Sequence, residues 1–302
     1  MNNQINMTKT IGIIAPSYFV NNEKIEKIEK FLNEKNLNCI FAKNIYKKHH
    51  VYAGSNQERT EGIMDIYSDK KVDIVLALRG GDGCLSVIDL IDYKIIKQNP
   101  KPLFGYSDIT ALHSAIIKNT NQQTFYSLNA SNLIDPEEKT NNLSKEHFLN
   151  QINNLSNQEI DTLTQKNIKV IKDGMVKGIS FGGNISVLQE NIGTINDTSF
   201  DNKILFLEDA KRNMMDFINT LIHLKRSGKF NKIKGLILGE IFDIKSNDEN
   251  LNFSIDEIIN EIFYDYNIPI IANAPFGHGS NKICIPLNQD ITLNTKNEIK
   301  FY

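Results

Sequence analysis

The stretch Val72-Asp-Ile-Val-Leu-Ala-Leu78, followed at once by Arg79-Gly-Gly-Asp-Gly83, is an apolar run that ends in a glycine-rich turn. Runs of this kind are typical of strands that are buried on both faces. The first 125 residues alternate such runs with segments whose apolar residues recur at helical spacing. The sequence therefore predicts βαβ units and an α/β fold with a parallel sheet that helices cover on both sides.

The expected elements follow from this alternation. In the first half, strands are predicted at Thr10–Ala15, Leu37–Phe41, Val72–Leu78 and Pro102–Tyr106, and helices around Ile25–Leu32 and at Gln57–Tyr67, Leu85–Ile91 and Ile109–Lys118. In the second half, we expect a glycine-rich piece at Gly178–Asn184 that opens a helix, strands at Lys203–Leu207 and Gly235–Leu238, a helix at Asn213–Lys225, and strand and turn over Ile268–Ala274 and Ile283–Phe301.

A change of composition separates the two halves. From Asn129 to Asp173, polar residues prevail and large apolar ones are few, which indicates a mobile connector with one helix near Lys145–Asn154. We therefore expect an N-terminal domain over residues 1–128, a connector over 129–175 and a C-terminal domain over 176–302. The length of 302 residues agrees with this division, because domains of roughly 150 residues predict about two domains for this chain.

Composition excludes several classes of function. The 34 basic and 36 acidic residues leave a net charge of −2, so no global positive field attracts nucleic acid or anionic lipid. Hydrophobic residues at 40% predict a folded protein rather than a disordered one. Three widely spaced cysteines favour a reducing compartment over a disulfide framework. With apolar stretches far shorter than the ~20 residues of a membrane span, we expect a cytoplasmic protein with no anchor.

Ser107 is the first candidate for chemistry. It lies in Gly105-Tyr-Ser-Asp-Ile-Thr110, where a strand gives way to a helix, so backbone N–H groups and the positive end of the helix dipole lie beside it. An anion that forms there is stabilised, as acyl transfer requires, although the G-x-S-x-G spacing of a nucleophile elbow is absent. The alternative is that Ser107 or Asp108 only caps the helix.

A nucleophilic serine also needs a base and an acid that orients the base. Of the six histidines, His278 lies in a glycine-flanked loop, Pro275–Ser280, after an apolar run. Glu208 and Asp209 directly follow a predicted buried strand, where an unpaired carboxylate is energetically costly. The alternatives are a structural loop histidine and an acid-rich helix start. Ser107, Glu208 and His278 together would form a triad drawn from both domains.

The turn Arg79–Gly83 is the fourth candidate. Its glycines permit close backbone approach, and free N–H groups there can face an oxyanion or a phosphate. Gly-Gly-Asp-Gly also occurs in NAD kinases and related lipid kinases, where the Asp serves phosphoryl transfer. A nucleotide kinase is therefore the rival from another class, and a non-catalytic binding module is a third option that the joint occurrence of triad residues disfavours.

Taken together, these motifs resemble those of the serine LD-carboxypeptidases, a group that also contains the microcin-immunity peptidases. The similarity covers nearly the whole chain in family order. The matching stretches are Ile11–Ser17, Tyr52–Ser55 with Glu58 and Arg59, Arg79–Gly83, Gly105–His113, Gly182–Asn184, Leu205–Asp209, Gly235–Gly239 and Gly277–Gly279.

The resemblance implies a Rossmann-like N-terminal domain, a smaller β-rich α/β C-terminal domain, and a homodimer. It implies that Ser107 is the nucleophile, His278 the general base and acid, and Glu208 the orienting acid. The oxyanion hole would use backbone N–H groups of Asp108 and of the Gly80–Gly81 turn. Neither a metal nor another cofactor is implied.

The substrate implied by the resemblance is a small peptide, a murein tetrapeptide that loses its terminal D-alanine in the cytoplasm. A peptidyl-nucleotide amide is the alternative, which the absence of tryptophan disfavours. Candidates for holding substrate or its terminal carboxylate are Arg79, Arg59, Asn184 and Lys282. The chain departs from the family pattern at Gly81–Gly83, at Tyr126–Asn129 and at Ala210–Met214, and we expect these positions to border the substrate pocket.

Overall fold

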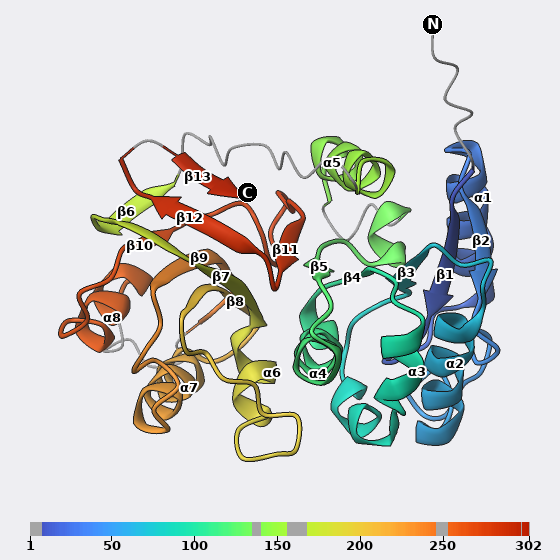
Figure 1. The fold of residues 1–302 in the computed structure, drawn as a ribbon, viewed down its shortest axis with the longest axis horizontal. Coiled ribbons are helices and arrows are strands. Elements are labelled where there is room, and N and C mark those ends of the chain that lie inside the picture. The colour runs from blue at the N-terminus through green and yellow to red at the C-terminus, as the bar shows by residue number, and fades with distance from the viewer. Residues whose placement is uncertain (1–7, 135–139, 156–167, 246–252, 297, 302) are drawn as a thin grey trace, which may run out of the picture.

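The computed structural model describes residues 8–134, 140–155, 168–245, 253–296 and 298–301, and it places them in two sheets that lie side by side with helices around them (Figure 1). Across these ranges, no helix combines the length and the hydropathy that a bilayer span requires.

The first sheet has six strands in the order β11-β5-β4-β3-β1-β2. All neighbouring strands in it are parallel except β11 with β5, which confirms the parallel sheet predicted for the first half. The strands are β1 (Thr10–Ile14), β2 (Asn38–Phe41), β3 (Ile74–Ala77), β4 (Leu103–Gly105), β5 (Thr124–Tyr126) and β11 (Ile285–Leu287).

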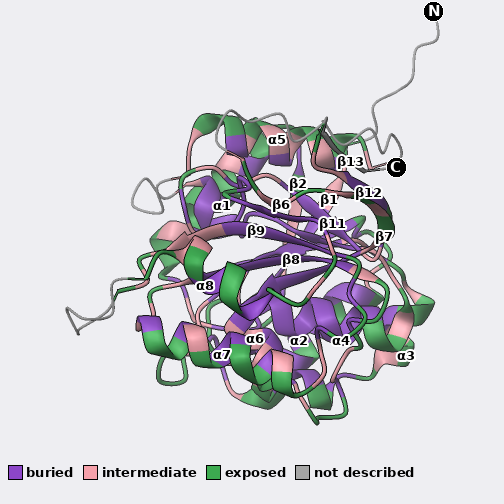
Figure 2. Ribbon diagram, turned by 90° about the vertical axis from the view of Figure 1, so that its left-hand side faces the viewer, coloured by how far each residue is buried: buried purple, intermediate pink, exposed green. Residues whose placement is uncertain are grey.

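Helices cover both faces of this sheet because its strands are apolar on both sides. On one face, Ile74 and Leu76 of β3 pack with residues of α1 (Asn22–Glu34) and α5 (Asn142–Asn153). On the other, Val75 and Ala77 pack with residues of α2, α3 and α4, whose bounds are Asn56–Ser68, Tyr93–Gln98 and Thr110–Thr120. Figure 2 shows the buried strands between helices whose outer sides are exposed.

The second sheet has seven strands in the order β13-β12-β7-β8-β9-β10-β6. The four central strands β7 to β10 run parallel, and β6, β12 and β13 are antiparallel to their neighbours. The bounds are β6 (Lys169–Lys172), β7 (Met175–Asn184), β8 (Lys203–Ala210), β9 (Gly235–Phe242), β10 (Ile270–Ala272), β12 (Asp290–Asn294) and β13 (Glu298–Phe301), with helices α6 (Ile185–Glu190), α7 (Met214–Arg226) and α8 (Ile255–Ile262).

The segment 85–91, predicted as a helix, forms two short 3₁₀ turns instead, at Cys84–Ser86 and Ile88–Leu90. Gly83 precedes them in the left-handed region, with φ of 109°. Its carbonyl accepts hydrogen bonds from the Ser86 N–H at 3.1 Å, the Ser86 hydroxyl at 2.7 Å and Arg59 Nη1 at 2.8 Å. These bonds close a tight turn, so the i to i+4 ladder of an α-helix does not start there.

Two segments from beyond residue 128 pack against the first sheet. Strand β11 pairs with β5, and its C-terminal position in the chain gave no sign of this. The helix predicted near 145–154 corresponds to α5, whose Phe148 and Ile152 are buried in one cluster with Phe104. Residues 135–139 and 156–167 of the predicted connector lie outside the described residues.

Phe148 is expected to fix α5 to the sheet. Its ring lies edge-on to Phe104 at 5.7 Å, and Phe104 stacks on Phe125 at 4.6 Å. Replacing Phe148 by Ala leaves a cavity and should lower the free energy of unfolding by about 3–5 kcal/mol. Leu143, on the same helix and 72% exposed, supplies the control, and Leu143→Ala should change it by less than about 0.5 kcal/mol. Urea unfolding followed by circular dichroism measures both, and equal effects would contradict this packing.

Candidate active site

Ser107 lies in a strained turn between β4 and α4. Its φ is +65°, in the left-handed region that residues with a side chain seldom adopt. Ser107 is the first residue of a 3₁₀ turn over Ser107–Ile109, and α4 begins at Thr110. Neither Ser107 nor Asp108 caps this helix through its side chain, so the capping alternative finds no support. The turn presents the Ser107 hydroxyl at the carboxyl end of the sheet, where ligand sites of α/β folds occur.

The structure brings Ser107, His278 and Glu208 together from segments far apart in the sequence. The distance from Ser107 Oγ to His278 Nε2 is 3.1 Å, and that from His278 Nδ1 to Glu208 Oε2 is 2.7 Å. Since the carboxylate can only accept, Nδ1 carries the proton, and Nε2 is left to accept the proton of the Ser107 hydroxyl. Gly277, with φ of +111°, lets the histidine loop pass close to Glu208.

Glu208 is fully buried at the end of β8 and is surrounded by donors. Its Oε1 accepts hydrogen bonds from the Tyr126 hydroxyl at 2.6 Å and from Asn184 Nδ2 at 3.0 Å. Burial alone would raise the pKa of Glu208, but the charge of His278 and the hydrogen bonds from His278, Tyr126 and Asn184 outweigh it and lower the pKa. The carboxylate therefore stays ionised at neutral pH.

The same carboxylate makes His278 more basic. Burial lowers the pKa of His278, yet the charge of Glu208 and the hydrogen bond to it prevail and place the pKa above the ordinary value of 6.5. His278 is therefore suited to take a proton from Ser107 and to hold it while Glu208 balances its charge.

Backbone N–H groups beside Ser107 are available for an oxyanion. Within the described part of the chain, the N–H groups of Asp108, Gly80 and Gly81 make no hydrogen bond. Gly80 lies against Ser107, since a Cβ on Gly80 would be 3.4 Å from Ser107 Oγ. The N–H of Ser107 itself donates to Tyr126 Oη at 3.1 Å and is therefore occupied.

Arg59 is a buried side chain that stabilises the glycine-rich turn Arg79–Gly83 through hydrogen bonds. It is 1% exposed, and its guanidinium donates to the carbonyls of Pro16 and Gly83 and to the side chains of Asn56 and Ser86. Both terminal nitrogens of Arg59 are therefore used within the protein, and its Nε, which has no partner among the described residues, is buried, so the structure does not support Arg59 as a ligand of a substrate carboxylate.

Asp108, next to Ser107 in the chain, is anchored by hydrogen bonds from two sides. Its Oδ2 accepts hydrogen bonds from the Ser17 hydroxyl at 2.5 Å and the Cys84 N–H at 2.9 Å. Burial raises the pKa of Asp108 to about 6 although these bonds act in the opposite direction. The side chain thus ties the Ser107 turn to the loop that follows β1 and to the residue that follows the glycine-rich turn.

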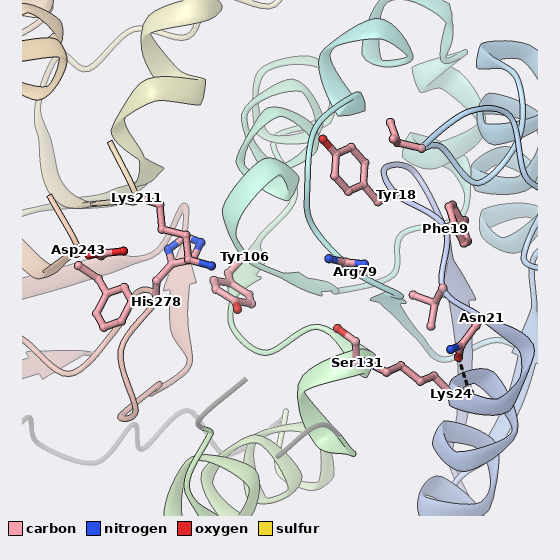
Figure 3. A pocket seen from close by; sticks show the side chains of 13 residues that line it. Tyr18, Phe19, Asn21, Lys24, Arg79, Tyr106, Ser131, Lys211, Asp243 and His278 are labelled. Carbon is pink, nitrogen blue, oxygen red and sulfur yellow. Dashed lines mark hydrogen bonds between the residues drawn. The ribbon is translucent and has the colours of Figure 1, made fainter. Parts of the chain in front are cut away.

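His278 lines two cavities, and Ser107 lines the smaller of them. The larger, about 700 Å³, has Lys211, Asp243 and His278 on one side and Arg79 and Tyr18 on the other, as Figure 3 shows. The smaller, about 350 Å³, is lined by two of the three residues whose N–H groups are predicted to face an oxyanion, Gly81 and Asp108; its lining also includes Asp82, Gly83, Ser107, Asn184, Asp209, Ala210 and Arg212.

The cavities show which predicted positions border the site. Gly81–Gly83 and residues 210–212 line the two cavities, as expected from their departure from the family pattern. Tyr126, which also departs from that pattern, is buried and lines neither cavity. Lys282 lies under the histidine loop, where its Nζ donates to the Gly279 carbonyl at 2.5 Å. Lys211 and Arg212 lie in the segment 210–214 that the sequence places at the border of the pocket, but no motif in the sequence marks either of them as a ligand.

Comparison with known proteins agrees with this geometry. Residues 11–127 match the family model of the LD-carboxypeptidase N-terminal domain, and residues 177–293 match that of the LD-carboxypeptidase C-terminal domain. The chain belongs to the LD-carboxypeptidase family. The resemblance seen in the sequence is thereby confirmed, and the chain is a serine peptidase by family rather than a kinase.

Individual relatives extend this finding. A Bacillus subtilis (strain 168) protein named "Probable murein peptide carboxypeptidase" is 27% identical over 293 residues, which cover 96% of this chain and 90% of the relative. The structure of muramoyltetrapeptide carboxypeptidase from Oxalobacter formigenes is 25% identical with a TM-score of 0.85, covering 97% and 99% of the two chains. MccF in complex with glutamyl sulfamoyl guanosine, at 22% identity and a TM-score of 0.87 over 97% and 95%, shares the fold.

The charge of Glu208 should set the pKa of His278. In Glu208→Gln the carboxylate is lost while burial remains, so the pKa of His278 should fall from above 6.5 to below it, and kcat should drop on the order of 10⁴-fold. NMR titration of the His278 ring, assigned with His278→Gln, measures the shift. Asp209→Asn, one residue away, serves as control and should move it less. An unchanged pKa in Glu208→Gln would show that the pair does not interact as described.

Proposed function

We propose that this chain is a serine carboxypeptidase that hydrolyses the L,D bond of a murein tetrapeptide and releases its terminal D-alanine. The observation that carries the proposal is the continuous hydrogen-bonded path from Ser107 through His278 to Glu208, beside unpaired backbone donors. Family relatives named as carboxypeptidases of murein peptides support the same substrate class.

The proposed reaction has two halves. Ser107 Oγ attacks the carbonyl carbon of the scissile bond while His278 Nε2 takes its proton, and the N–H groups of Asp108 and the Gly80–Gly81 turn stabilise the oxyanion. His278 then gives the proton to the leaving amine of D-alanine, and an ester with Ser107 forms. In the second half, water loses a proton to His278 and attacks the ester, and Ser107 regains its proton as the tripeptide leaves. Glu208 stays ionised throughout.

Positive charge in the larger cavity fits an anionic substrate. Arg79 and Lys211 reach it from the two sides of the site, and neither has an ion-pair partner among the described residues. Lys211 also keeps a left-handed φ of +57°, a strained conformation of the kind found at functional sites. Stem peptides carry several carboxylates, which such cations bind through charge-assisted hydrogen bonds.

A peptidyl-nucleotide is the second candidate substrate. The rings of Tyr18, Phe19 and Tyr106 line the larger cavity, where aromatic faces can stack on a base. The likeness to MccF, solved with glutamyl sulfamoyl guanosine, points the same way. We place the reaction in the cytoplasm, as a step in peptidoglycan recycling. The three free thiols Cys39, Cys84 and Cys284 support a reducing compartment.

The substrate proposal is tested by mass spectrometry of products from murein tetrapeptide and from a peptidyl-adenylate conjugate. Release of D-alanine is the expected result. Arg79→Gln and Lys211→Gln should each raise KM about tenfold or more, the scale of one charge-assisted hydrogen bond, with kcat within a few-fold. Lys234→Gln, at an exposed lysine outside both cavities, is the control. Cleavage of the conjugate alone would replace the murein peptide by the nucleotide substrate, and cleavage of neither would refute both.

A further inference from the structure

The hydroxyl of Tyr126 lies between the two ends of the catalytic path. It donates to Glu208 Oε1 at 2.6 Å and accepts the N–H of Ser107 at 3.1 Å, and the side chain is 1% exposed. We propose that Tyr126 is a positioning residue of the reaction, whose hydroxyl couples the turn that carries Ser107 to Glu208 in the other sheet. This inference rests on the proposed serine chemistry, but not on the identity of the peptide.

The position of the hydroxyl is fixed by the fold. Tyr126 is the last residue of β5, and its register places it opposite Gly105 of β4 on one side and Ile285 of β11 on the other. Its ring contacts the rings of Tyr106 at 6.2 Å and Phe276 at 6.5 Å, both edge-on. The backbone of Tyr126 is thus fixed within the first sheet by strands on both sides, and its ring packs against two other rings. The hydroxyl therefore defines where the carboxylate sits relative to Ser107.

The bond to Ser107 has a second consequence. In many serine hydrolases the N–H of the nucleophile is free to serve the oxyanion. Here that N–H points to Tyr126, so the oxyanion must rely on Asp108 and the Gly80–Gly81 turn. Tyr126 thus holds the turn in its left-handed conformation while it orients the acid.

Loss of the hydroxyl should also change the balance of charge in the site. The groups that act on His278 are Glu208, Lys282 and Asp209, and those that act on Glu208 are His278, Tyr126, Asn184 and, more distantly, Glu240. Tyr126 and Asn184 are the neutral donors to Glu208, and Tyr126 makes the shorter bond, 2.6 Å against 3.0 Å. Without it, the carboxylate interacts more strongly with protonated His278, and His278 becomes harder to deprotonate.

The test compares Tyr126→Phe with Tyr67→Phe. Tyr67 is also fully buried, but its hydroxyl has no hydrogen-bond partner in the described part of the chain, so its removal leaves the site unchanged. The readout is the rate constant at which a fluorophosphonate probe modifies Ser107, measured against pH. This reaction needs the triad but no peptide. For Tyr126→Phe we expect a 10- to 100-fold lower rate constant. We also expect the acidic limb of its pH profile, where the rate constant falls as His278 becomes protonated, to lie about half a pH unit higher. Tyr67→Phe should match the parent in both.

A second replacement at position 126 distinguishes loss of the hydroxyl from a general loss of structure. Incorporation of 3-fluorotyrosine at position 126 keeps the hydroxyl and makes it a stronger donor, so the acidic limb should move to lower pH, opposite to Tyr126→Phe. A rate constant for Tyr126→Phe within twofold of the parent, or two replacements that shift the limb in the same direction, would overturn the inference. A parent that the probe does not modify would instead refute Ser107 as the nucleophile, and with it the proposed function.

Discussion

A buried negative charge at Glu208 is the constraint on which the site depends. A carboxylate with no exposed surface is unfavourable unless donors surround it, and here they come from three places: Tyr126 from the first sheet, Asn184 from β7 and His278 from the loop after β10. Removing any one leaves part of the charge unpaired. The geometry around Glu208 is therefore specified more strictly than that of an exposed residue.

The two sheets contact each other directly beside this charge. The backbone N–H of Asn184 donates to Thr110 Oγ1 at 3.0 Å, three residues after Ser107, and Gly183 lies so close to Thr110 that a Cβ would be 2.5 Å from that oxygen. The strand end that supplies Asn184 thus contacts the start of α4 directly. Because Ser107 and Glu208 belong to different sheets, this close contact keeps the 3.1 Å and 2.7 Å distances of the path.

Local patterns in the sequence were enough for β1 to β4 of the first sheet and for the three residues that the structure brings together at the site. The strand at 72–78 is readable because apolar residues occupy both of its faces, and Ser107, Glu208 and His278 are readable because each lies near the end of a strand in a motif of its own. Pairing between segments far apart in the sequence could not be predicted in this way. The three residues of β11 join the first sheet, and Tyr126 reaches Glu208 over 82 positions, and neither leaves a local signal. Arg59 shows the converse, since a charged side chain that looked like a ligand is an internal support.

We expect Ser107 to become covalently acylated during the reaction when Glu208 and His278 are in place. Mass spectrometry of peptides from enzyme that is quenched with acid while it turns over murein tetrapeptide measures this most directly. The tripeptide acyl group should be found on Ser107 in the parent and should be absent in Ser107→Ala. Turnover with the acyl group on another residue, or undiminished hydrolysis by Ser107→Ala, would contradict it.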